Sequence, residues 1–178
     1  GVTGPSLIPE AFRRNRDLFR YPILSALYRQ CFVHPETRPG HLTSAGTFVP
    51  LPDWSYAGPV EFLEACHMSF NTEALQAVGG FDEAYRGVGD WSESDAGFRM
   101  RRAYGECLIF DPALRVEHRC AAGGATVLRL GDARQRLDNY LRFSQKWVRP
   151  HWRHLLYRTF LRGYYSWQPL RAQLTSCP

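Results

Sequence analysis

The sequence predicts an α/β domain followed by a helical C-terminal extension. Short strand patterns alternate with helical patterns over residues 1–120, and residues 132–178 follow a helical pattern. The chain has 178 residues, of which 44% are hydrophobic and 22% charged. It is therefore long enough for one domain with a hydrophobic core, and its composition argues against a disordered, collagen-like or disulfide-rich protein.

Charge divides the chain into two expected parts, residues 1–130 and residues 131–178. The second part has nine basic residues and two acids, a balance of +7, whereas the first part has a balance of −2. No apolar run approaches the roughly 18 to 20 residues that cross a bilayer. The five cysteines form no CxxC pair, which argues against a zinc ribbon and favours reduced thiols in a cytoplasmic protein.

The N-terminal third is predicted to hold a strand, a helix and a long loop. Residues 1–9 have the pattern of a strand end and a turn, and residues 10–34 have a helical pattern that Pro22 weakens in the middle. Its buried face is expected to hold residues at three- and four-residue spacing: Leu18, Tyr21, Leu24 and Tyr28. Residues 35–59 contain five prolines, which predicts a loop with at most short strands.

The middle of the chain starts with a strand pattern at residues 60–70 and a short helix pattern at residues 72–78. Asn71 or Thr72 would cap the start of this helix, and Gly79-Gly80 would end it in a left-handed turn.

A second helix is expected to begin with Ser92 as its N-cap and Asp95 at capping-box spacing. Residues 107–119 predict two short strands around an Asp-Pro turn, and the Gly-Gly-Ala sequence at 123–125 predicts a break.

The tail is predicted to form two amphipathic helices separated by Pro150. The first begins at Asp132, and its apolar face is expected to hold Leu137, Tyr140, Leu141, Ser144, Trp147 and Val148. The apolar face of the second is expected to hold Trp152, Leu155, Leu156 and Phe160.

Residues 60–120 contain a series of motifs in a defined order: CHMSF, TEALQAVGGFDE, WSESDAGFRMRRA, IFDP and VEH. In this order they resemble the inverting, family-2-like glycosyltransferases of the GT-A fold, which is Rossmann-like. In that family an Asp-x-Asp motif in the N-terminal half holds a divalent metal on the donor diphosphate, and no Asp-x-Asp occurs in this sequence. The resemblance therefore implies a partial GT-A domain, the acceptor-side half.

The resemblance also implies an activity. Such enzymes transfer a sugar from a nucleotide-diphosphate sugar to a hydroxyl acceptor, such as a glycan or a lipid-linked saccharide. A divalent cation, Mn²⁺ or Mg²⁺, is expected only together with the missing upstream half. We therefore expect the isolated chain to be inactive.

Glu93 matches the family's catalytic carboxylate, which takes a proton from the attacking hydroxyl. A position at the start of a helix keeps a carboxylate ionised, which suits a general base. Asp95 is the second acid of the motif and is assigned to the substrate site. Acids in a first helical turn also serve as caps, and this alternative applies to Asp95 more than to Glu93.

Four further residues complete the expected site. His118 matches a histidine that is a metal ligand in some members; alternatively it is bonded to solvent or backbone at a strand end. Asp82 and Glu83 are expected to bind sugar hydroxyls, or else to lie in solvent beside a helix end. Trp91 is expected to stack on a sugar face, with a place in the core as the alternative.

The alternative function is a non-catalytic basic module that binds an anionic membrane surface or nucleic acid through its aromatic, basic tail. The order of the motifs favours the enzyme, and we expect no nucleic-acid partner. The tail itself is expected to form a helix pair packed on the domain, or to contact the inner face of the plasma membrane as a peripheral surface.

Overall fold

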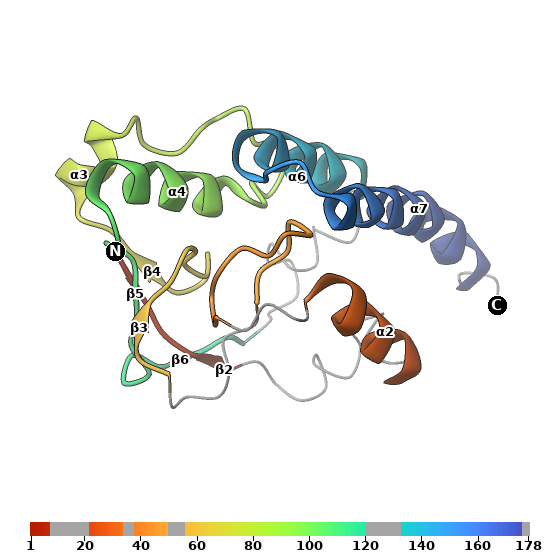
Figure 1. Ribbon diagram of the computed structural model, residues 1–178, viewed down its shortest axis with the longest axis horizontal. Coiled ribbons are helices and arrows are strands. Elements are labelled where there is room, and N and C mark those ends of the chain that lie inside the picture. The colour runs from red at the N-terminus through yellow and green to blue at the C-terminus, as the bar shows by residue number, and fades with distance from the viewer. Residues whose placement is uncertain (8–21, 34–37, 50–55, 120–132, 176–178) are drawn as a thin grey trace.

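The computed structural model describes residues 1–7, 22–33, 38–49, 56–119 and 133–175. These residues form a mixed α/β structure with small sheets and helices around them (Figure 1), as the sequence predicts at this coarse level. Within them, no helix combines the length and the apolar character that crossing a bilayer requires.

The larger sheet has the strand order β3-β5-β1-β4. Strand β1 (Val2–Thr3) pairs in parallel with β5 (Ile109–Phe110) and antiparallel with β4 (Met68–Ser69). Strand β3 (Gly58–Pro59) covers the other side of β5, antiparallel to it.

A second parallel pair continues along the same two segments of chain. Strand β2 (Ser6–Leu7) pairs with β6 (Val116–Glu117). Gly4 separates β1 from β2 at a close approach, because a Cβ atom there would lie 1.9 Å from the carbonyl oxygen of Leu114. The two short strands expected within residues 107–119, with a turn at Asp111 between them, are confirmed.

The strand expected over residues 60–70 is wrong for most of its length, because only Met68–Ser69 forms a strand. A turn interrupts it, in which the amide of His67 donates to the carbonyl oxygen of Glu64. Val60 and Leu63 are both fully buried, and they pack in a cluster with Met100, Leu108 and Phe110. These apolar residues therefore belong to a packed loop and do not form the alternating pattern of a β-strand.

The helices are α2 (Pro22–Phe32), α3 (Thr72–Ala77), α4 (Ser92–Tyr104), α6 (Ala133–Trp147) and α7 (Trp152–Thr175). The short helix α3 is confirmed. The side chain of its N-cap, Asn71, accepts from the amide of Ala74, and Gly79 and Gly80 follow with positive φ.

Helix α2 begins at Pro22, which fits a first helical position. The earlier part of the expected helix, residues 10–21, lies outside the described residues. Of the buried face expected here, Tyr28 packs against the core, whereas Leu24 is 51% exposed. The remaining residues of that face, Leu18 and Tyr21, lie outside the described residues.

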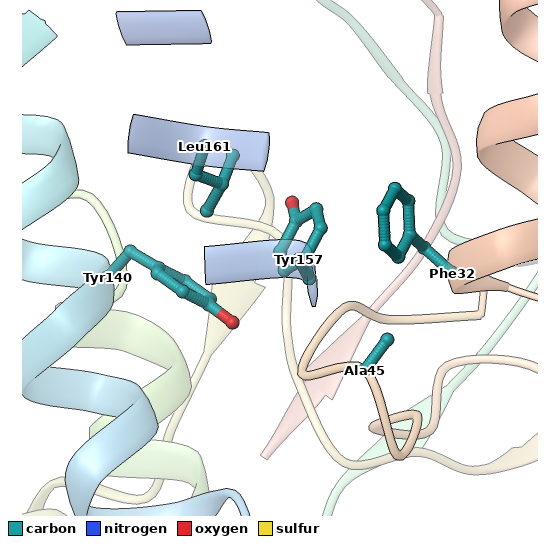
Figure 2. Close-up of a cluster of buried hydrophobic side chains, with 5 residues drawn as sticks. All are labelled: Phe32, Ala45, Tyr140, Tyr157 and Leu161. Carbon is teal, nitrogen blue, oxygen red and sulfur yellow. The ribbon is translucent and has the colours of Figure 1, made fainter. Parts of the chain in front are cut away.

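The C-terminal helices share a core with the N-terminal segment. Figure 2 shows the buried cluster, in which residues of α2, the loop at 38–49, α6 and α7 meet: Phe32, Ala45, Tyr140, Tyr157 and Leu161. The rings of Phe32 and Tyr157 lie 5.0 Å apart, and those of Tyr140 and Tyr157 lie 5.4 Å apart. Helices α6 and α7 thus pack on α2 and the loop at 38–49. The domain boundary that we expected at residue 130 falls outside the described residues.

Three of the four residues of α7 that we expected to be buried are exposed, because Trp152 is 66%, Leu155 62% and Leu156 45% exposed. The fourth, Phe160, is partly buried and packs against the core cluster, as expected. Arg153 and His154, which lie between Trp152 and Leu155 in the sequence, are buried instead. Arg153 supplies a reason for this rotation of the helix. Its Nε atom donates to the carbonyl oxygen of Cys31 over 2.9 Å, and its guanidinium also reaches the Ser44 hydroxyl. The Cys31 carbonyl lies in the last turn of α2, where backbone acceptors lack partners within the helix.

Candidate functional site

Helix α4 starts at a residue with a left-handed backbone. Trp91 is its N-cap, with a φ of 76° and no side-chain cap, and the amide of Asp95 donates to the Trp91 carbonyl oxygen. The expected cap at Ser92 is therefore wrong by one residue, and Asp95 does not close a capping box. Positive φ is unfavourable for a tryptophan. Packing of its ring holds it in place, against Phe48, Tyr140 and Phe143.

Glu93 lies in the first turn of α4 and is half-buried. One of its carboxylate oxygens is 3.5 Å from the Ser92 hydroxyl, which donates to it. The positive end of the helix dipole favours the ionised form of a carboxylate at this position.

Asp95 is fully buried, and donors of four described side chains surround its carboxylate. Its Oδ1 atom accepts from Trp147 Nε1 at 2.9 Å, Lys146 Nζ at 3.1 Å and the Tyr85 hydroxyl at 3.2 Å. Its Oδ2 atom accepts from Arg99 Nε at 2.9 Å. Two of these donors come from the end of α6, so the carboxylate connects α4 to the C-terminal helices.

The environment of Asp95 sets its charge. Burial alone would raise the pKa of this carboxyl, but the hydrogen bonds from Trp147, Lys146 and Arg99 lower it more, so the pKa lies below its ordinary value. Burial and the adjacent Asp95 charge raise the pKa of Tyr85 well above its ordinary value. Asp95 is thus a fixed anion, and Tyr85 is its neutral donor.

Arg99 extends this network to the loop that follows α3. Its two terminal nitrogens donate to the carbonyl oxygens of Val78, at 2.5 Å, and Gly80, at 2.6 Å. The loop is therefore held against α4 through one guanidinium.

Asp82 is part of the same hydrogen-bond network, and its carboxylate does not simply lie in solvent. Its carboxylate accepts from the amide of Ala84 at 2.9 Å and from Lys146 Nζ at 2.7 Å. The hydrogen bond from Lys146 is the main reason that the pKa of Asp82 is lowered. Lys146 also lies over the ring of Tyr85, 5.4 Å from its centroid.

The other two residues expected to bind a sugar differ in their surroundings. Glu83 is exposed, next to Asp82. Trp91 is half-buried and packs against the core cluster that contains Tyr140, which agrees with the alternative that this residue lies in the core. Stacking of Trp91 on a sugar remains a prediction.

His118 follows strand β6, and its amide donates to the carbonyl oxygen of Leu7. In Figure 1, β6 and α4 are well separated. Among the residues that the structure describes, no three histidine, cysteine, aspartate or glutamate side chains gather where they could hold a metal ion. The described residues alone thus hold no complete metal site, and the metal role of His118, expected only together with the upstream half, stays a prediction.

Sequence reasoning missed Lys146, Trp147 and Tyr85 as members of this site. Lys146 and Trp147 lie 51 and 52 residues from Asp95 along the chain, so no local spacing connects them. One signal was present, because Lys146 is the single lysine among 22 basic residues.

No protein-family model, curated protein or solved structure matches this chain.

Proposed function

We propose that this chain carries the acceptor side of an inverting glycosyltransferase, with Glu93 as the general base. One observation carries the proposal: the two acids at the start of α4 have different surroundings. Asp95 is buried and accepts hydrogen bonds from four described side chains, whereas Glu93 is only half-buried. A base must be reachable by the acceptor, and a saturated, buried carboxylate is not.

In the proposed step, Glu93 takes the proton of an acceptor hydroxyl while the hydroxyl oxygen forms a bond to the anomeric carbon of the donor sugar. The bond from that carbon to the diphosphate oxygen breaks on the opposite face, and the nucleoside diphosphate leaves with the electron pair. The sugar configuration is inverted. The Asp95 network supports this step because it holds the first turn of α4 and the loop at 79–91 in one arrangement.

The substrates follow from the same resemblance: a nucleotide-diphosphate sugar as donor, and a glycan or lipid-linked saccharide as acceptor. Glu83 is exposed at the loop that Arg99 and Lys146 hold, and we assign it a hydrogen bond to a sugar hydroxyl. Asp82 is held by Lys146, so its contribution is to position this loop.

The test uses the complete gene product, a panel of nucleotide-diphosphate sugars and saccharide acceptors, and release of nucleoside diphosphate as the readout. Turnover with one donor that Glu93→Gln abolishes supports the proposal. The matched control is Glu73→Gln, which changes another glutamate in the first turn of a helix, α3. If Glu93→Gln keeps the turnover of the Glu73→Gln control, Glu93 is not the base.

A further inference from the structure

Helices α2 and α7 both expose large apolar side chains. On α2 these are Ile23 (77% exposed), Leu24 (51%) and Leu27 (55%). On α7 they are Trp152 (66% exposed), Leu155 (62%) and Leu156 (45%), and we call these three residues of α7 the apolar face. On each helix the three residues are spaced by one, three or four positions, so they share one side of that helix.

Helix α7, which carries the apolar face, is a neighbour of α2. Aromatic rings join them on their inner sides, with Tyr28 6.2 Å from Tyr157 and Phe32 5.5 Å from Phe160. Figure 1 shows α2 beside α7 at one end of the molecule. The core therefore contacts the side of α7 that holds Tyr157 and Leu161, and the apolar face lies on the opposite side of that helix.

The charged residues of α2 and α7 themselves have one sign. Neither α2 nor α7 contains an aspartate or glutamate, and the sequence has no acid after Asp138. At 100° per residue, Arg158 and Arg162 lie beside the side of α7 that holds Leu155. Arg162 is exposed and Arg158 is half-buried, and Arg149, just before α7, is also exposed.

We propose that the apolar face and these arginines dock the protein on an anionic membrane surface. An interfacial helix combines exposed leucine and tryptophan with basic residues, which matches α7 at its first turns. Tryptophan favours the boundary between acyl chains and headgroups, and arginine binds lipid phosphates. The charge argues against a second copy of this chain as the occupant, because symmetric pairing would bring two acid-free, basic faces together.

The experiment is flotation of the 178-residue chain with vesicles of phosphatidylcholine alone, or with about 30% phosphatidylglycerol, at low and high salt. We expect binding to the anionic vesicles that high salt weakens, because the attraction is partly electrostatic and is screened. Equal binding to both kinds of vesicle, or no binding to either, would overturn the proposal.

Two variants separate the apolar and the basic contributions. Trp152→Ser with Leu155→Ser removes apolar surface, and Arg158→Gln with Arg162→Gln removes charge. Each should lower the partition coefficient by about tenfold or more. The matched controls, Leu114→Ser for exposed apolar surface and Arg102→Gln for an exposed charge on α4, should leave it unchanged.

Circular dichroism melts verify that each variant is folded, and sedimentation gives the oligomeric state. Both tail variants should stay folded, because Trp152, Leu155 and Arg162 are exposed and Arg158 is half-buried. A fall in binding that the control variants share equally would overturn the proposal. So would a dimer that dissociates in the Trp152 and Leu155 variant, because a second copy would then cover the apolar face.

Discussion

The Nζ atom of Lys146 lies 3.1 Å from Oδ1 of Asp95, a carboxylate that is fully buried. The same nitrogen lies 2.7 Å from Asp82. The chain's single lysine thus joins the end of α6 to both the start of α4 and the loop before it. Helix α6 and the candidate site are therefore parts of one packed unit.

Replacing Lys146 with methionine should destabilise the protein. The change leaves the buried Asp95 with fewer donors, which is costly, although Lys146 is 37% exposed and water replaces part of its contribution. We expect a loss of about 1–3 kcal/mol in the free energy of unfolding, measured with urea. The control is Arg38→Gln, which breaks a pair with Glu106 in which both side chains are more than half exposed and should have almost no effect. Equal losses in the two variants would contradict this role of Lys146.

The contribution of this network should depend on pH in a defined direction. The pKa of both Asp82 and Asp95 lies below the ordinary 3.8, so their contribution is complete above about pH 4 and is lost as the pH falls through the folded-state values. The pKa of Lys146 is raised above 10.5: burial opposes this, but the bonds to Asp82 and Asp95 outweigh it. Its contribution is therefore complete below about pH 10 and is lost at higher pH.

The measurement is the difference in unfolding free energy between the wild type and Lys146→Met across the pH range. We expect this difference to be constant from about pH 5 to pH 9 and to shrink below about pH 4. A difference that grows as the pH falls would contradict the lowered pKa of the two acids.

Two glycine substitutions should change stability in opposite directions. Gly46 has a φ of +82°, and a Cβ atom there would lie 2.6 Å from the buried hydroxyl of Tyr140, so Gly46→Ala should cost about 2 kcal/mol or more. Gly163 lies within α7 with nothing within 4 Å of an added Cβ, so Gly163→Ala should stabilise by up to about 1 kcal/mol. Thermal unfolding of both variants checks this, and a stabilising Gly46→Ala would show that the loop at 38–49 does not pack on α6 as described.

Local signals in the sequence predicted several elements correctly. Asn71 and the pair Gly79-Gly80 mark the two ends of α3, because capping and left-handed turns depend on neighbouring residues. The break between α6 and α7 follows from Pro150 in the same way.

Long-range contacts were not predictable in this way. The buried side of α7 is fixed partly by Arg153, whose acceptor on Cys31 lies 122 residues away. Hydrophobic spacing alone selected Phe160 correctly but also selected Trp152, Leu155 and Leu156, which are exposed. Asp95 was assigned to the substrate site, with a helix cap as the alternative, and neither assignment pointed to its partners on α6, which are more than 50 residues away. Buried polar contacts replace apolar packing at both positions: hydrogen bonds to a carbonyl and a hydroxyl oxygen at Arg153, and ion pairs at Asp95. A pattern of apolar residues does not predict such contacts.

The turnover number of Glu93→Gln in the complete gene product tests the central claim most directly. Glutamine keeps the shape of the side chain and cannot take the acceptor proton. We expect turnover to fall by about 100-fold to 10,000-fold while the KM for the donor sugar stays unchanged. Turnover within about twofold of the Glu73→Gln control would contradict the assignment of Glu93 as the base.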